Sequence, residues 1–141
     1  MKNVYTPIVQ ATRQSVEFHD ITQHVKNAVA KTKIKNGLVT VFTQHTTCAI
    51  KINENEEKLM QDMLIFLEKM VPQKGKYGHD IHPVDGRKNA HSHLKALFLT
   101  ASESIPLKKG KLLLGEWQRV FLVELDGPRE KRTVIIHTMG A

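Results

Sequence analysis

The order in which strand-like and helix-like patterns follow one another is the feature that most constrains the fold of this chain. Val4–Ile8 and Ser15–Phe18 alternate apolar with polar residues, which is the two-residue period of half-buried strands. We expect these two segments to form an opening hairpin. Four further strands separated by turns are predicted for the C-terminal third, at Ser104–Leu107, Leu112–Leu114, Val120–Leu125 and Thr133–His137.

Helical patterns lie between these two groups of strands. Ile21, Val25, Ala28 and Val29 share one face of a helix that Asn36-Gly37 is expected to stop. Leu38–Thr43 then predicts an interior strand. A second helix is expected to begin near Asn53 and to bury a stripe consisting of Leu59, Met60, Met63, Leu64, Leu67 and Met70, and a short third helix is expected from Asn89 to Leu99. This mixture predicts an α+β fold rather than a parallel βαβ fold.

The size and composition of the chain limit its class. Its 141 residues fit one domain spanning residues 1–141, with 40% hydrophobic and 25% charged residues. No apolar run approaches the roughly 20 residues of a membrane span, and the N-terminus shows no signal sequence, so we expect a cytoplasmic protein. The lone Cys48 excludes an internal disulfide.

A net charge of +7 raises the question of nucleic-acid binding. The lysines are spread over several turns without aromatic residues between them, so nucleic acid is an unlikely partner and solubility is the simpler explanation. An excess of positive charge also favours a phosphorylated small-molecule substrate.

The eight histidines fall into two groups. His19, His24 and His137 lie in ordinary strand or helix patterns, whereas the others lie at strand ends, in a glycine-rich loop or at a helix start. Neutral imidazole is a good ligand for divalent metals, and a catalytic site often uses three protein ligands. His45, His79 and His93 are therefore candidate metal ligands. The alternative, that each is a hydrogen-bonded or surface histidine, stays equally open. Asn89 stands at a predicted helix start, where backbone N–H groups favour phosphate.

Several other side chains are candidates for chemistry or binding. Glu54 and Asp62 are each candidates for a general base or for supporting a ligand; the alternatives, that Asp62 faces solvent and that Glu54 favours a helix N-terminus, stay equally open. Cys48 is more typical of a buried, inert thiol than of a nucleophile. Trp117 could wall a pocket or enter the core, and Gln118 adds a donor and an acceptor.

Taken together, a set of motifs resembles the YjbQ-like family, in that family's order and over nearly the whole chain. These motifs are His45-Thr46-Thr47-Cys48-Ala49-Ile50-Lys51-Ile52-Asn53-Glu54, Asp62, Tyr77-Gly78-His79-Asp80, Asn89-Ala90 with Ser92-His93-Leu94-Lys95-Ala96, Gly110 through Leu114-Gly115-Glu116-Trp117-Gln118, and Glu124 through Asp126-Gly127-Pro128-Arg129.

The resemblance implies an α+β fold of two packed, mainly antiparallel sheets with flanking helices, a homotrimer, and a weak activity as a secondary thiamine-phosphate synthase. That reaction joins a pyrimidine methyl diphosphate to a thiazole phosphate, with a divalent metal ion, zinc or magnesium, steadying the released diphosphate. The family's positions make His45, His79 and His93 the expected metal ligands. They make Glu54, Asp62 and Gln118 catalytic and Asn89, Trp117 and Arg129 substrate-binding.

The substrate and the functional class both stay open. Glu116 stands where the family usually has a small residue, which puts an identical substrate preference in doubt. The main alternative to an enzyme is a non-catalytic, metal- or metabolite-binding trimeric module, and a third possibility is a basic RNA-associated protein.

Overall fold

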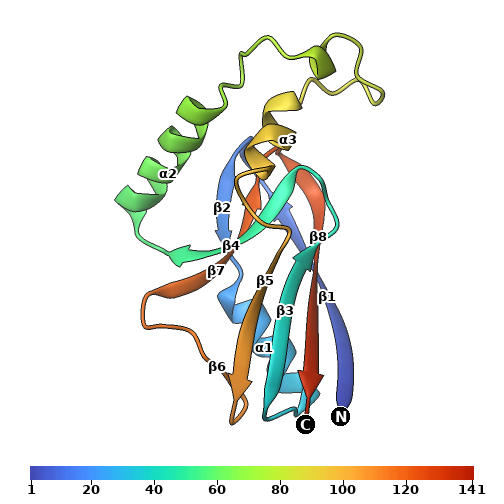
Figure 1. The fold of residues 1–141 in the computed structure, drawn as a ribbon, viewed down its shortest axis with the longest axis vertical. Coiled ribbons are helices and arrows are strands. Elements are labelled where there is room, and N and C mark those ends of the chain that lie inside the picture. The colour runs from blue at the N-terminus through green and yellow to red at the C-terminus, as the bar shows by residue number, and fades with distance from the viewer.

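The computed structural model describes residues 1–141 and contains two antiparallel sheets (Figure 1). The larger sheet has the strand order β1-β8-β3-β5-β6. Its members are β1 (Lys2–Thr12), β8 (Arg129–Gly140), β3 (Gly37–Thr43), β5 (Ser102–Lys108) and β6 (Lys111–Leu112). The first and last long strands of the chain therefore lie side by side, and both termini lie at the same end of the molecule.

The smaller sheet has the order β2-β7-β4, formed by β2 (Glu17–Asp20), β7 (Gln118–Glu124) and β4 (Cys48–Glu54). The prediction of an opening hairpin is wrong, because β1 pairs with β8 whereas β2 pairs with β7. The alternation of these two segments identifies them as strands, but their partners lie more than a hundred residues further along the chain. The predicted α+β fold with two antiparallel sheets is confirmed.

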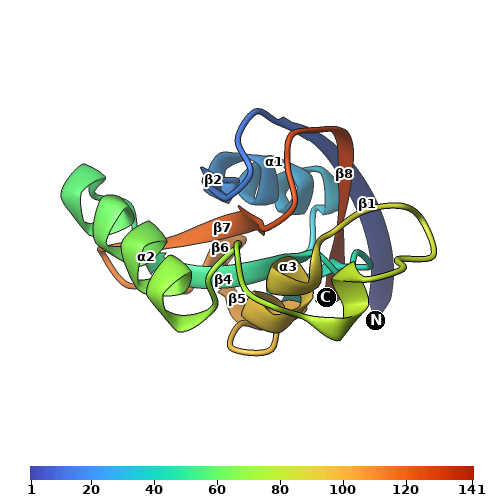
Figure 2. The same cartoon turned by 90° about the horizontal axis from the view of Figure 1, so that it is seen from above.

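Helix α1 (Thr22–Thr32) packs against both sheets and helps to fill the space between them. Figure 2 shows this arrangement from above. Val25, Ala28 and Val29 are buried as expected. They join the main core, which takes Val39 and Ile136 from the larger sheet and further side chains from the smaller one. The helix ends earlier than predicted, at Thr32, and is capped by Lys33, whose φ of 61° lies in the left-handed region.

The opposite face of the smaller sheet carries a second core below helices α2 (Glu57–Met70) and α3 (Ala90–Ala96), with the short 3₁₀ helix η1 (Gly78–Asp80) in the loop between them. Glu56, rather than Asn53, caps α2 by accepting hydrogen bonds from the backbone N–H groups of Lys58 and Leu59. No helix of the structure is long and apolar enough to cross a membrane.

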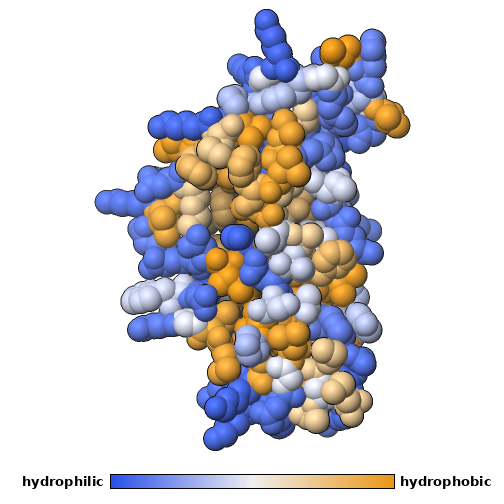
Figure 3. All heavy atoms as spheres, viewed as in Figure 1, coloured by the Kyte–Doolittle hydropathy of each residue, from blue (hydrophilic) through white to orange (hydrophobic).

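The predicted apolar stripe of α2 is only partly buried. Of the predicted stripe, Leu67 is buried, Met70 is exposed, and the other four residues are half-buried. Figure 3 shows hydrophobic atoms gathered on this face of the molecule around α2 and α3. The periodicity of α2 identified the helix correctly but overestimated how much of its stripe the chain itself covers.

Candidate functional site

A polar pocket of about 320 Å³ lies where segments distant in the sequence meet, at the ends of the strands near α3. The turn between β3 and β4, the start of β8, and α3 with the residues just before it supply its walls. Its lining contains no hydrophobic residue and consists of Gln44, His45, Thr46, Thr47, Asp85, Asn89, His93, Arg129 and Arg132. Four of the predicted site residues, His45, Asn89, His93 and Arg129, are thus brought together.

Arg132 is a buried residue of the pocket lining and forms an ion pair with Glu124. Arg132 donates from Nε to Glu124 Oε2 at 2.6 Å and from Nη2 to Oε1 at 2.5 Å, and it also donates to Thr47 Oγ1 at 2.9 Å. Arg132 is 2% exposed and Glu124 is fully buried. Burial is the largest single influence on Arg132 and by itself lowers the pKa of the guanidinium. Hydrogen bonding to Glu124 and the nearby charges of Glu124 and Asp126 together outweigh burial and raise this pKa above its ordinary value. This charge stays fixed in place.

Asp126 fixes a second set of donors beside the pocket. Its carboxylate accepts from Arg87 Nε and Nη2, both at 2.9 Å, from Arg129 Nη2 at 2.8 Å, and from Asn89 Nδ2 at 2.8 Å. Burial raises the pKa of Asp126, but the hydrogen bonds from Arg87, Asn89 and Arg129 outweigh it and hold the pKa far below its usual range. Arg129 is thereby oriented while the guanidinium stays one third exposed.

Asn89, which is itself oriented by Asp126, in turn orients the ring of His79 through a hydrogen bond. Because the Asn89 amide nitrogen donates to Asp126, its Oδ1 faces His79 Nε2 at 2.9 Å, and a neutral His79 must carry its proton on Nε2. His79 Nδ1 then has a free lone pair. The ring of His93 meets that of His79 edge to face, with centroids 5.1 Å apart.

His45 has the opposite tautomer. The backbone N–H of Thr133 donates to His45 Nε2 at 3.0 Å, so a neutral His45 carries its proton on Nδ1. Burial, and next the charge of Arg132, lower the pKa of His45 and favour this neutral form. Nδ1 has no hydrogen-bond partner in the chain and is not buried. His45 therefore offers an N–H donor at the pocket wall.

These tautomers bear on the predicted metal site. No group of three or more His, Cys, Asp or Glu side chains lies in position to hold a metal ion. His45 and His93 line the polar pocket, while His79 lies on a neighbouring cavity, and His45 Nε2 is already an acceptor. A metal held by His45, His79 and His93 of one chain does not fit this arrangement. A metal site stays a prediction that requires donors from elsewhere.

Two of the predicted catalytic residues, Glu54 and Gln118, lie at the other end of the smaller sheet, and the third, Asp62, lies on α2. Glu54 pairs with Gln118, whereas Cys48, close to His45, pairs with Glu124. At about 3.3 Å per residue, the ends of this seven-residue strand are about 20 Å apart. Trp117 is 66% exposed, and Asp62 is exposed on α2. One chain therefore does not bring Glu54, Asp62, Trp117 or Gln118 to the polar pocket.

Three further polar or ionisable residues, Cys48, His91 and Asp80, differ in their burial and hydrogen bonding. Cys48 is buried, as expected, and burial raises the pKa of its thiol. His91 is also buried, and its Nδ1 lacks a partner, while burial and then Lys95 lower its pKa. Asp80 accepts a hydrogen bond from the backbone N–H of Ala90 at 3.0 Å, which ties the loop to the start of α3.

Glu124, Asp126 and Arg132 belong to the site but were not predicted from the sequence. Glu124 and Asp126 belong to a motif shared with the YjbQ-like family, but the motif alone predicts no role for either carboxylate. Arg132 stands in an alternating strand, where a charged residue usually faces solvent. A signal was present nonetheless, because Arg132 is in phase with the apolar Val134 and Ile136, which are both buried.

Known proteins resemble this chain over most of its length. A family described as "UPF0047 protein YjbQ-like" matches residues 7–141. A UPF0047 protein of Archaeoglobus fulgidus is 45% identical over 124 residues, covering 88% of this chain and 93% of that protein. The UPF0047 protein YugU of Bacillus subtilis is 35% identical over 131 residues, covering 92% and 94%.

Solved structures show the same fold. A YbjQ-like protein of unknown function from Sulfolobus solfataricus P2 superimposes with a TM-score of 0.94 at 38% identity, covering 99% of each chain. A hypothetical protein from Aeropyrum pernix K1 gives a TM-score of 0.88 at 34% identity, covering 100% of each chain.

Proposed function

The chain belongs to the family of UPF0047 YjbQ-like proteins, and on that premise we propose that its polar pocket binds the diphosphate of a small metabolite and promotes group transfer from it. The reaction that the family resemblance implies is thiamine-phosphate synthesis, at a low rate. The thiazole nitrogen attacks the methylene carbon of the pyrimidine methyl diphosphate. The new C–N bond forms with the nitrogen's electron pair, and the C–O bond breaks with its pair leaving on pyrophosphate.

The observation that supports this proposal most directly is the pocket's lining of fixed donors without any apolar side chain. Arg129 is oriented by Asp126, and His45 presents Nδ1–H. Arginine suits phosphate because its planar fork donates in pairs. A departing diphosphate gains negative charge, and donors already held in place stabilise that charge without reorganising. Asp85 also lines the pocket, but its Oδ1 accepts from the backbone N–H of Arg87.

The reaction needs no general base in this chain, because the attacking thiazole nitrogen carries no proton. His45 and Arg129 therefore bind the diphosphate in this scheme, while His79 lines the adjoining cavity and His93 lines both. No step passes through a metal ion, because one chain does not assemble the expected ligands. Glu54, Asp62 and Gln118 keep their predicted roles only if a second chain supplies them.

The test starts with binding. Pyrophosphate is titrated calorimetrically into wild-type protein, Arg129→Gln, and the matched control Lys131→Gln, which removes the same charge from an exposed neighbour on β8. We expect Arg129→Gln to weaken binding about tenfold or more, which corresponds to one charge-assisted hydrogen bond of about 1.4 kcal/mol or more, and Lys131→Gln to bind like wild type. Equal affinities in the two variants would show that this pocket is not the site.

Turnover is then measured separately, as thiamine phosphate formed from the two phosphorylated precursors by mass spectrometry. Pyrophosphate binding without turnover above a protein-free control would leave the non-catalytic metabolite-binding module as the better account. The titration is repeated after chelation of divalent ions. Binding that disappears on chelation would show that a cation enters with the diphosphate and would restore the metal to the site.

A further inference from the structure

Seven exposed lysines gather at the end of the molecule that carries both termini (Figure 1). They lie on α1, on the turn from α1 to β3, and around the turn from β5 to β6. These residues, called here the lysine patch, are Lys26, Lys31, Lys33, Lys35, Lys108, Lys109 and Lys111. In the sequence they are spread over separate turns, but the fold brings these turns together.

The two turns are held against each other at Gly110. Its backbone N–H donates to the carbonyl of Lys35 at 2.8 Å. A Cβ added at Gly110 would stand 3.6 Å from Lys35 Nζ, so the Lys35 ammonium lies beside the β5–β6 turn. Gly110 also lines a hollow of about 420 Å³ together with Lys26 and Lys111. Lysines from α1 and from both turns therefore converge around one glycine.

No carboxylate side chain offsets the charge of the lysine patch. Asp and Glu are absent from residues 21–53, 104–115 and 131–141, which contain α1, β3, the β5–β6 turn and most of β8. None of the seven lysines forms an ion pair. Removing them from the 21 Lys and Arg leaves 14, which the 14 Asp and Glu balance, so the patch carries an excess equal to the whole net charge of +7. Charge that only keeps a protein soluble is usually interspersed with the opposite sign, whereas a patch of one sign attracts polyanions.

Lysine also stands at two positions where the backbone favours other residues. Lys33, with a φ of 61°, and Lys109, with a φ of 52°, are the residues other than glycine that have a positive φ. Glycine and asparagine are usual in this left-handed region, because a larger side chain crowds the backbone there. The helix dipole favours a cation near the end of α1, such as Lys31 in its last turn, but it does not reach the β5–β6 turn. Local structure therefore does not account for a lysine at position 109.

We propose that the lysine patch binds the phosphate backbone of a nucleic acid without reading its sequence. Lysines gain free energy by displacing the counterions condensed on closely spaced phosphates. Residues 21–41 and 104–115 contain no Phe, Tyr or Trp on which a base could stack, so the contacts stop at the backbone. A membrane suits the patch less, because no large exposed apolar residue lies within residues 22–36 or 108–112 to enter a bilayer. The polar pocket lies at the opposite end of β8, about 36 Å away at about 3.3 Å per residue, so this proposal does not depend on the proposed function.

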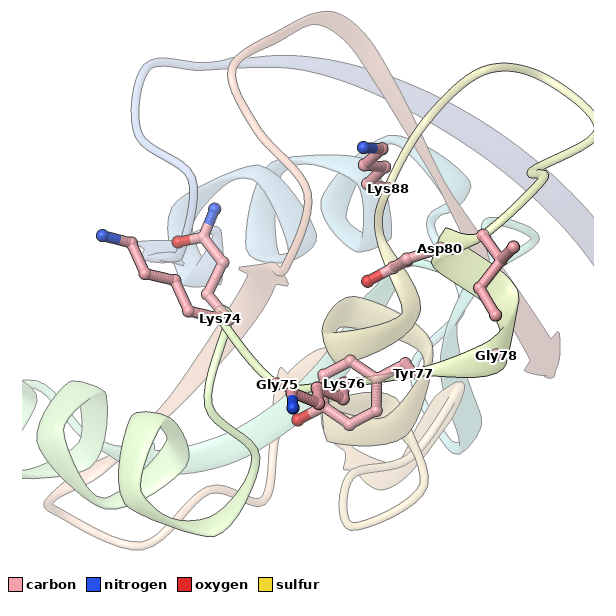
Figure 4. Close-up of a pocket in the computed structure, with 9 residues that line it drawn as sticks. Lys74, Gly75, Lys76, Tyr77, Gly78, Asp80 and Lys88 are labelled. Atoms are coloured by element: carbon pink, nitrogen blue, oxygen red, sulfur yellow. The ribbon is translucent and has the colours of Figure 1, made fainter.

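The test compares two triple variants that lower the net charge equally. The patch variant is Lys35→Gln/Lys108→Gln/Lys111→Gln. The loop variant, Lys74→Gln/Lys76→Gln/Lys88→Gln, changes lysines of the loop between α2 and α3, which do not converge (Figure 4). All six side chains are exposed and none forms an ion pair, so circular dichroism should show a native fold in both variants.

Binding is measured by fluorescence anisotropy with a labelled single-stranded RNA of about 20 nucleotides and mixed sequence, at salt concentrations from about 50 to 200 mM. At the lowest salt concentration we expect the patch variant to bind about tenfold or more weakly than wild type, and the loop variant to bind like wild type. The slope of log K against log salt concentration should become shallower by about 2 in the patch variant, because each lost phosphate contact removes about 0.7. Equal weakening in both variants, or no binding by wild type at the lowest salt concentration, overturns the proposal. Patch-dependent binding to vesicles containing phosphatidylserine, with RNA bound equally by wild type and the patch variant, assigns the patch to a membrane and also overturns it.

Discussion

Replacing Glu124 alone should destabilise the protein strongly, because it leaves the Arg132 charge buried without its partner. Glu124 accepts four hydrogen bonds: two from Arg132, one from Thr12 Oγ1 and one from the backbone N–H of Asp126. Glu124→Leu removes all four acceptors and keeps a similar volume. Water cannot readily replace them, since neither Arg132 nor Glu124 is more than 3% exposed.

Breaking a buried ion pair from one side typically costs about 3–5 kcal/mol, and this pair has the burial that such costs require. With a urea m-value of about 2 kcal/mol/M, we expect the unfolding midpoint of Glu124→Leu to fall by about 1.5–2.5 M. Combining Glu124→Leu with Arg132→Met removes both charges. The double variant should then cost less than the two single costs together, by about 2–3 kcal/mol, although the Asp126 N–H still loses its acceptor.

The assay is equilibrium urea unfolding followed by circular dichroism, with Glu130→Leu as control. Glu130 lies on β8, is exposed, and has no ion-pair partner, so its replacement should change stability by less than about 0.5 kcal/mol. A Glu124→Leu cost below about 1 kcal/mol, or strictly additive costs in the double variant, would refute the reasoning that this pair is a buried and mutually dependent unit.

Two other predictions concern acid stability and assembly. Burial raises the pKa of Asp20, but hydrogen bonds from Arg119, then Thr22 and Asn55, outweigh it and lower the pKa from 3.8 to about 2. A carboxyl group with a depressed pKa stabilises the folded state at pH values above the ordinary pKa, so about 2 kcal/mol of unfolding free energy should be lost as the pH falls from about 4 to 2. In urea unfolding, Asp20→Asn should show a weaker dependence of the unfolding free energy on pH over that range. The same pH dependence in Asp20→Asn as in wild type would contradict this prediction. We also propose a homotrimer, supported by exposed apolar residues on the outer face of the larger sheet, including Tyr5, Val9 and Phe42. Light scattering should give three times 16.0 kDa for wild type and less for Val9→Glu, whereas a wild-type monomer at micromolar concentration would count against the proposal.

The fold class and most elements could be predicted because their signals are local. The alternation within β8, the strand patterns of β3 and β7, and the turn at Lys109-Gly110 each depend on a few neighbouring residues. Strand pairing could not be predicted in the same way. The register of Tyr5 opposite His137 depends on a partner at the far end of the chain, and nothing in the first twenty residues specifies it.

The candidate site was predictable only in part, for a related reason. His45, Asn89, His93 and Arg129 stand at ends of strands or around a short helix, where side chains from distant segments meet, and they do meet at the polar pocket. The residues that orient them were not found, because a charged residue inside a strand or turn ordinarily faces solvent. For Arg132 the one local signal is its alternation in phase with the buried Val134 and Ile136 on β8.

The run from His45 to Glu54 shows why a continuous motif need not form a continuous site. Cys48 and Ile50 join the core between the sheets, while Ala49 joins the core on the opposite face below α2 and α3. Burial on both faces restricts Cys48, Ala49 and Ile50 to apolar or small residues, so packing alone accounts for this part of the motif. Chemistry is then left to its ends, which the same strand holds about 20 Å apart. The likeness of Glu54 to a family position therefore carries less weight for catalysis than that of His45, whose N–H donor lies in a pocket with Arg129.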